Sequence, residues 1–177
     1  MKIKIKKQDK VKEFKLISNW EDVTLENWIS LINFKAKTKS GEALETISTL
    51  SNIPKELINQ LELQDVSVIL NKIAVLQHKQ NSTLKNIIKI DGVEYGFHPD
   101  LDSITLGEYA DIESLIKEGI ENNLPSLMAV LYRPVKDKGE NGVYTIEAYD
   151  GNITIRAEQI KKMSAEQVQS ALVFFYL

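Results

Sequence analysis

The chain has 177 residues, 43% of them apolar, and no cysteine. It can therefore bury a core without disulfides, and it cannot form a thiolate metal site, an iron–sulfur cluster or a cysteine nucleophile. Its 22 cationic residues comprise 20 lysines and only two arginines, Arg133 and Arg156, against 25 acids, which gives a net charge of −3. So few arginines argue against sequence-specific recognition of nucleic acid.

The first half of the chain opens with a pattern typical of a β-hairpin. Isoleucine alternates with lysine over residues 2–6, the alternation resumes over residues 11–17, and a short polar connection separates the two stretches.

The first residues lack the continuous apolar core of a signal peptide, and no apolar run approaches the length of a membrane span, about 20 residues. We therefore expect a soluble protein made in a cytosol.

Four stretches then place apolar residues at helical spacing. They predict helices over residues 24–35, 40–50, 54–61 and 65–78. Pro54 opens the third because proline suits the first position of a helix.

The second half of the chain also opens with a hairpin pattern, over residues 88–95, where Asp91-Gly92 is typical of a tight turn. A charged, glycine-containing loop is expected over residues 136–142. Val143–Tyr149 and Ile153–Arg156 alternate on either side of another Asp-Gly pair, which predicts a third hairpin.

Three further helices are expected in this half. One runs over residues 105–119, one begins at Pro125 and stops before Pro134, and one begins at about Ser164 and ends the chain. The elements together predict an α+β fold of amphipathic helices packed with short antiparallel hairpins. We expect one compact unit with two lobes, residues 1–82 and 83–177.

A weak internal repeat aligns Val23–Trp28 with Ile104–Tyr109, at an offset of 81 residues (105 − 24). Thr24 and Thr105 are predicted N-caps, Trp28 and Tyr109 are predicted to pack on the residue before each cap, and Glu108 completes a capping box. Duplication of an ancestral segment would explain the match, and so would independent capping of two helices. The second explanation stays open because residues 163–168 repeat the pattern without a hairpin directly before them.

His98, Asp100 and Asp102 place an imidazole and two carboxylates within five residues, the side-chain types that hold divalent cations. The alternative, which we favour, is that an aspartate interacts with the positive end of the helix that follows. The phosphate-binding, zinc-hydrolase, nucleophile-elbow and EF-hand motifs are missing from the sequence. We expect no metal, no cofactor and no catalytic residue.

Charge is distributed unevenly along the chain. Residues 1–15 carry seven lysines and two acids, net +5, whereas residues 91–121 carry nine acids and one lysine, net −8. Lys2, Lys4 and Lys6 fall on one strand face, where they could contact nucleic-acid phosphates or simply discourage edge-to-edge strand pairing. A third reading is that they contact the acidic helix of another copy.

The last five residues, Val173–Leu177, place apolar side chains all round a helix end. They are either part of the core or a docking tail whose Phe174, Phe175 and Tyr176 bind a partner.

Three groups of segments together resemble small proteins from the structural and assembly gene blocks of tailed bacteriophages, particularly crAss-like phages. The segments are Trp20–Leu25; Leu50–Pro54 with Leu61 and Asp65-Val66; and Asp91–Tyr95 with Ile104–Tyr109 and Leu131–Pro134. The 20 lysines, 21 isoleucines and 12 asparagines, against two arginines, also suit an AT-rich genome.

The resemblance implies a non-enzymatic virion structural protein, made in the bacterial host cytoplasm and present in multiple copies at the portal vertex or neck. Its implied partners are portal, capsid or neck proteins and copies of itself, with neither specific nucleic-acid recognition nor a membrane. The alternative that it implies is a tail assembly chaperone or scaffold that is absent from the mature virion.

Overall fold

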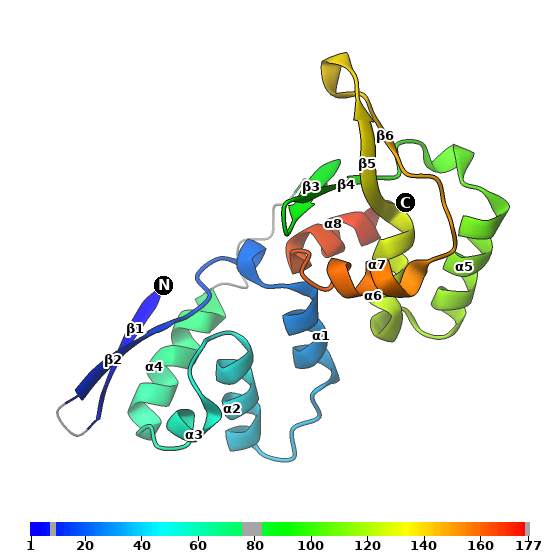
Figure 1. Ribbon diagram of the computed structural model, residues 1–177. Helices are drawn as coiled ribbons and strands as arrows, with labels where there is room; N and C mark the ends of the chain where they lie inside the picture. The colour runs from blue at the N-terminus through cyan, green and yellow to red at the C-terminus, as the bar shows by residue number, and fades with distance from the viewer. Residues whose placement is uncertain (8–9, 76–82, 176–177) are drawn as a thin grey trace. The chain divides into compact units, whose positions relative to one another are not determined.

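Helices and short antiparallel sheets make up the computed structural model, which describes residues 1–7, 10–75 and 83–175 (Figure 1). The expected α+β fold is confirmed. Contacts divide the chain into two compact units, Met1–Asn81 and Ser82–Leu177, which we call unit 1 and unit 2 and describe separately.

Unit 1 begins with a two-stranded antiparallel ribbon of β1 (Lys2–Lys7) and β2 (Lys10–Lys15), in which Ile3 lies opposite Phe14. At the base of the ribbon, the Leu16 amide donates to the Met1 carbonyl and Leu16 forms a bridge with Ser51. The helices of this unit are η1 (Trp20–Asp22), α1 (Leu25–Asn33), α2 (Lys39–Thr49), α3 (Lys55–Ile58) and α4 (Leu63–Ala74). The predicted helix over residues 65–78 extends beyond the described residues at its end.

The core of unit 1 is aliphatic. Each helix from α1 to α4 turns an apolar side chain inward, as its amphipathic pattern requires. The buried side chains are Leu16, Val23, Leu25, Ile47, Leu50, Ile53, Ile58, Ile69 and Ile73. The ribbon strands contribute no side chain to this set among the described residues, and Lys2 and Lys4 of β1 are exposed.

Unit 2 contains a four-stranded antiparallel sheet in the order β3-β4-β5-β6. Its strands are β3 (Ile87–Ile90), β4 (Val93–Phe97), β5 (Tyr132–Lys138) and β6 (Tyr144–Ile146). The β3–β4 turn has positive φ at Asp91 (49°) and Gly92 (87°), which the Asp-Gly signature predicts. Figure 1 shows the β5–β6 hairpin extending beyond the other two strands of this sheet.

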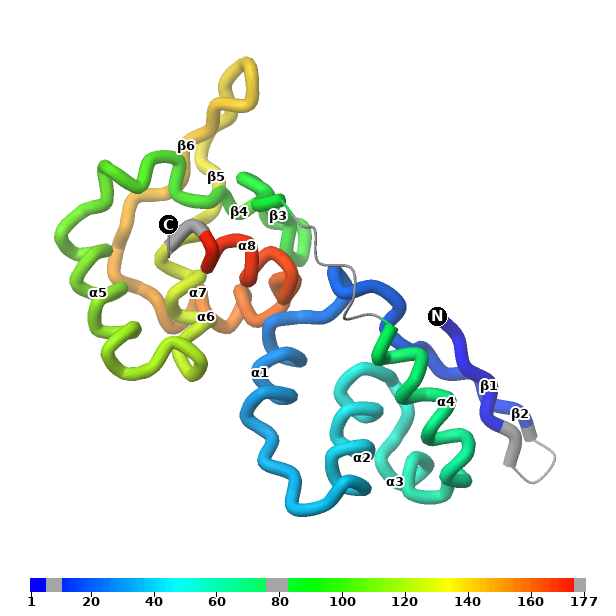
Figure 2. The backbone as a smooth tube through the Cα atoms, turned by 180° about the vertical axis from the view of Figure 1, so that it is seen from behind, coloured from blue at the N-terminus to red at the C-terminus, as the bar shows by residue number. Residues whose placement is uncertain are grey.

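The helices of unit 2 are η3 (Leu101–Ser103), α5 (Leu106–Lys117), α6 (Ile120–Leu131), η4 (Glu140–Gly142), α7 (Ile153–Ile160) and α8 (Ala165–Phe175). Helix α6 lies beside both α5 and α7 (Figure 2). Seven of its twelve residues are buried, and Leu124, Leu127, Met128 and Leu131 are among them.

The predicted start of α6 at Pro125 is wrong. Gly119, with φ at 108°, separates α5 from a helix that begins at Ile120, and Pro125 lies inside it. Proline removes one amide donor, so the carbonyl of Glu121, an exposed residue, receives no helical hydrogen bond from it. Burial of the residues that follow outweighs this lost bond.

The predicted third hairpin, between Val143–Tyr149 and Ile153–Arg156, is wrong because these two segments do not pair with each other. Tyr144–Ile146 pairs with β5, so the expected loop over residues 136–142 is the end of β5 and the tip of a β5–β6 hairpin. Ile153–Arg156 is not a strand but the start of α7, because Ile153, Ala157 and Ile160 share one helical face and α7 packs on α6. Tertiary contact overrides the β propensity of Ile-Thr-Ile.

Candidate functional site

A cluster of charged side chains is buried in unit 2 where α5, β4 and β5 meet. Glu108 on α5 is 1% exposed and Arg133 on β5 is 4% exposed, and the Arg133 Nη1 donates to the Glu108 Oε1. The His98 Nε2, just after β4, lies 3.5 Å from the same carboxylate oxygen. The cluster therefore links three elements through one carboxylate.

The second carboxylate oxygen of Glu108 is occupied by the capping box of α5. The backbone amide and the hydroxyl of Thr105 donate to it at 2.7 and 2.5 Å, and the Glu108 amide donates back to the Thr105 hydroxyl at 3.3 Å. Burial raises the pKa of the Glu108 carboxyl, but the Thr105 hydrogen bonds and the Arg133 charge outweigh it, so this pKa lies below its usual range. Glu108 is an anion at neutral pH.

Burial lowers the pKa of His98 below its usual value, and the nearby Arg133 charge adds to that effect, although the Glu108 charge opposes it. The His98 Nδ1 accepts the Asp100 amide at 3.3 Å. Both ring nitrogens thus face groups of the protein itself, and the imidazole is neutral at neutral pH.

Tyr149 covers the other side of the cluster. Its ring lies 5.7 Å from the Arg133 guanidinium, and its hydroxyl donates to the Asp111 carboxylate. Burial, together with the Asp111 hydrogen bond, raises the pKa of this hydroxyl. One anion and one cation neutralise each other in a closed site, which suits a structural clamp that orients α5 on the sheet better than a catalytic centre.

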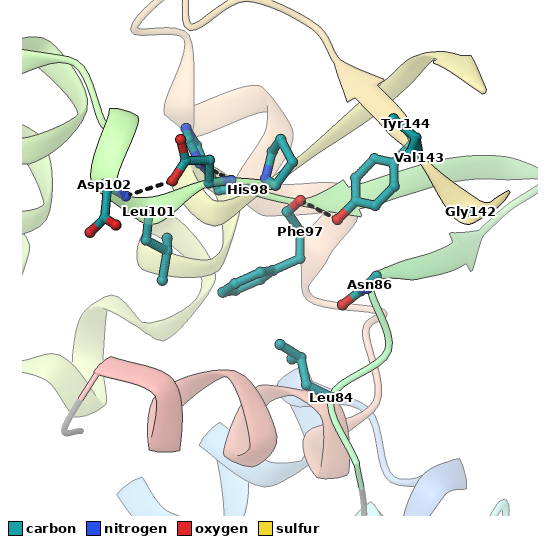
Figure 3. A pocket seen from close by; sticks show the side chains of 11 residues that line it. Leu84, Asn86, Phe97, His98, Leu101, Asp102, Gly142, Val143 and Tyr144 are labelled. Carbon is teal, nitrogen blue, oxygen red and sulfur yellow. Dashed lines mark hydrogen bonds between the residues drawn. The ribbon is translucent and has the colours of Figure 1, made fainter. Parts of the chain in front are cut away.

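Beside the cluster, the surface of unit 2 is hollowed by a groove of about 540 Å3 (Figure 3). Leu84, Phe97 and Leu101 point their side chains toward this space from the segment before β3, the end of β4 and η3. Tyr144 and Val143 form another part of the wall. We call this feature the groove, and its floor is apolar.

Glycine and backbone contacts hold the groove in shape. The Tyr144 hydroxyl donates to the Phe97 carbonyl at 2.6 Å, and a Cβ atom at Gly96 would lie 2.5 Å from the Tyr144 ring. Only glycine at position 96 therefore lets Tyr144 lie against β4. The Phe97 ring packs edge-on against Tyr132 at 5.2 Å, which fixes the floor from beneath.

The rim of the groove is acidic. Asp100 and Asp102 line it, and the described residues of the lining include no lysine or arginine. The Asp100 Oδ1 accepts the Asp102 amide at 3.1 Å, so Asp100 caps η3, the short helix that precedes α5. An apolar floor with two rim carboxylates favours a ligand that carries a cation next to an apolar group.

The predicted partner-binding lysines Lys2, Lys4 and Lys6 all lie on β1, in unit 1. Lys2 and Lys4 are exposed, whereas the side chain of Lys6 lies outside what the structure describes. Lys2 forms an ion pair of 2.5 Å with Glu13, which raises the pKa of Lys2 mainly through their hydrogen bond. Phe174 and Phe175 fall on α8, but their side chains and the whole of Tyr176 also lie outside the described part.

The predicted capping residues lie at helix starts in both units. The Thr24 hydroxyl accepts the Asn27 amide at 3.2 Å at the start of α1, and Thr105 occupies the matching position of α5. Trp28 is half-buried and lines a hollow of about 500 Å3 together with Trp20 and Phe34. Tyr109 is 58% exposed, so most of its ring contacts solvent.

The described residues also bear on metal binding and on membrane insertion. They include no group of three or more His, Asp or Glu side chains placed to bind one metal ion, so His98, Asp100 and Asp102 do not converge. Within the same ranges, every helix is too short or too polar to span a bilayer.

Sequence reasoning missed the pairing of Glu108 with Arg133 and the groove. The sequence did mark Arg133 as unusual, because it is one of only two arginines in a lysine-rich chain and follows an apolar helix.

Comparison of the chain with protein-family models, with curated proteins and with solved structures finds no significant match in any of the three. The function must therefore be inferred from the site.

Proposed function

We propose that the protein is a non-enzymatic, multi-copy structural component of a tailed bacteriophage particle, at the portal vertex or neck, where it packs against portal or capsid proteins. The observation that carries this proposal is the β1–β2 ribbon. Its described lysines, Lys2, Lys4, Lys12 and Lys15, are exposed, and none of the described side chains of this antiparallel pair is buried in the core of unit 1. Such a ribbon suits a contact with an acidic protein surface.

The ribbon favours protein over nucleic acid as its partner. Single-strand binders interleave aromatic side chains with their cations so that bases can stack. The ribbon has one aromatic residue, Phe14, which is half-buried on the face opposite to Lys2 and Lys4. Lysines without an aromatic platform or an arginine fork attract phosphates only weakly and without sequence preference.

The buried cluster supports a structural role in the same way. Glu108 and Arg133 are directed at each other, and Glu108 also at Thr105. His98 lines the groove, but its two ring nitrogens lie against the Glu108 carboxylate and the Asp100 amide. A general acid or base must reach the proton that it transfers. The cluster instead keeps α5 in a fixed position.

Mass spectrometry of purified particles tests this proposal. We expect the chain in mature virions at a copy number typical of a ring, in the range of the portal. Its absence from particles, with abundant protein in infected cells, would overturn the structural role and favour a tail assembly chaperone or scaffold.

A triple Lys2→Gln/Lys4→Gln/Lys6→Gln variant tests the ribbon directly. We expect it to reduce the yield of assembled particles while leaving the DNA content of those that form unchanged. The matched control is Lys35→Gln/Lys37→Gln/Lys39→Gln, which removes three exposed lysines elsewhere on unit 1. Tight, salt-sensitive DNA binding by the isolated wild-type protein would count against the proposal.

A further inference from the structure

The exposed face of the ribbon concentrates positive charge. Alternate residues place Lys2, Lys4 and Lys15 on this face, with Lys2 directly opposite Lys15. Like charges at directly opposed positions repel each other, and Glu13 is the one acid on this face among the described side chains. The face therefore favours an anionic partner.

The same face also carries an apolar side chain. Val11 lies opposite Lys6 in the register and is 58% exposed. A surface that presents a branched apolar side chain beside cations is complementary to a pocket with an apolar floor and an acidic rim.

The groove of unit 2 has that chemistry. Phe97, Leu101 and Leu84 form the floor, and Asp100 and Asp102 supply the charge. Residues 97–102 supply six of the residues that line the groove. They belong to the acidic stretch 91–121, which carries a net charge of −8 in the sequence, whereas residues 1–15 carry +5. Three acids of that stretch, Asp91, Glu94 and Glu108, are paired with Lys162, Lys138 and Arg133, so the charge at the rim comes from Asp100 and Asp102. A volume of about 540 Å3 accommodates a few side chains rather than a whole strand.

We propose that the β1–β2 ribbon of one copy docks in the groove of a second copy, with Val11 on the apolar floor and the ribbon lysines against Asp100 and Asp102. The contact joins two different surfaces, so it is heterologous and propagates copies head to tail into a ring or a filament. This inference rests on the proposed multi-copy function and names the partner of the ribbon as the chain itself.

Cysteine crosslinking tests the contact, because the chain contains no cysteine of its own. Val11→Cys in one chain and Val143→Cys in a second, distinguishable chain place one thiol on the ribbon and one on the groove wall, where Val143 is 66% exposed. We expect the mixed disulfide dimer to exceed that of the control by about tenfold. The control replaces Val143→Cys by Ile155→Cys on α7, a residue that is 67% exposed and lies outside the groove.

Charge variants of the full chain provide the second test. Lys4→Gln/Lys15→Gln removes charge from the ribbon, and Asp100→Asn/Asp102→Asn removes it from the rim while the amide oxygen of asparagine can still cap η3. Each is expected to weaken self-association about tenfold in sedimentation velocity. A rise from about 0.1 M to about 1 M salt, which shortens the screening length from about 10 to about 3 Å, should have a similar effect.

Mixing the two charge variants distinguishes a contact between copies from one within a chain. The ribbon variant keeps a working groove and the groove variant keeps a working ribbon, so we expect the mixture to form a dimer that does not grow further. No dimer in the mixture, equal crosslinking by the Ile155→Cys control, or a protein that stays monomeric at all concentrations would overturn the inference. A monomeric protein that is nonetheless found in virions would leave the proposed structural role intact.

Discussion

The two units of the chain deal with charge in opposite ways. Within the described residues, every buried polar or charged side chain, including His98, Glu108 and Arg133, lies in unit 2, whereas the buried side chains of unit 1 are all apolar. The described charged side chains of unit 1 lie outside its core, on the ribbon and on its helices and loops. Burial of an ion pair adds little net stability but penalises any arrangement that separates its members. We infer that unit 2 depends on specific pairing and unit 1 on apolar area alone.

Aromatic residues give each unit its own spectroscopic signal. Both tryptophans, Trp20 and Trp28, are in unit 1, and all six tyrosines lie after residue 82. Tryptophan fluorescence therefore reports on unit 1, whereas near-ultraviolet tyrosine dichroism reports on unit 2.

The largest effect is expected from Arg133→Met, which leaves the buried Glu108 carboxylate without its cation. Breaking one partner of a buried pair costs about 3–5 kcal/mol of unfolding free energy. We expect the tyrosine signal to be lost at much lower denaturant concentration than in the wild type, with a far smaller change in the tryptophan signal.

Arg156→Met is the matched control for that variant. Arg156 also forms an ion pair, but its partner Asp150 is largely exposed, and its guanidinium also donates to the Ala129 carbonyl at 3.1 Å. Because its removal leaves no buried charge unpaired, we expect a clearly smaller loss than from Arg133→Met. Equal losses in the two variants would show that the buried cluster has no special role in unit 2.

In unit 1, Ile47→Ala is the corresponding test of an apolar core. Ile47 is fully buried, and truncating such a side chain costs about 2–5 kcal/mol. We expect the unfolding transition followed by tryptophan fluorescence to move to a lower denaturant concentration. The size of this shift should be the same at about pH 5 and about pH 7, because the substitution removes no titrating group. Ile32→Ala, at a site that is 41% exposed, should cost far less.

The two helix caps give a smaller, graded comparison. Thr24→Ala and Thr105→Ala should each cost about 0.5–2 kcal/mol. We expect Thr105→Ala to lie at the upper end, because its hydroxyl also donates to the buried Glu108 carboxylate, and we expect serine at either position to restore most of the loss. A larger loss from Thr24→Ala would contradict the idea that the cap of α5 belongs to the cluster.

The smallest expected effect is the pH dependence of the stability of unit 2. The folded pKa values of His98 and Glu108 both lie below their usual values of 6.5 and 4.5. In both cases the unfolded chain binds protons that the folded chain does not, so stability is present above the usual pKa and falls as pH decreases through the folded one. We expect unit 2 to lose stability from pH 6.5 downward, in titrations followed by tyrosine dichroism.

His98→Gln separates the two contributions to that acid sensitivity. It should remove the upper part of the pH dependence, which His98 causes, and leave the lower part, which Glu108 causes. An unchanged profile would show that His98 does not titrate with unfolding.

Local elements were largely predictable from the sequence. The hairpin turn at Asp91-Gly92, the amphipathic helices of unit 1 and the capping box from Thr105 to Glu108 depend on residues within a few positions of one another. The start of α7 was not predictable in this way. Ile153-Thr154-Ile155 has the composition of a strand, and only its packing on α6 makes the helix more favourable.

The candidate sites also include one feature that could be predicted from the sequence and others that could not. Sequence alone determined the basic face of the ribbon, because alternation places Lys2, Lys4 and Lys6 on the same side of β1. The tertiary structure alone decided that Glu108 meets Arg133, 25 residues away, and that residues 84, 86, 97–102 and 142–144 enclose one groove. Periodicity carries the direction of each side chain relative to its own element, whereas contacts between distant elements depend on the path of the whole chain.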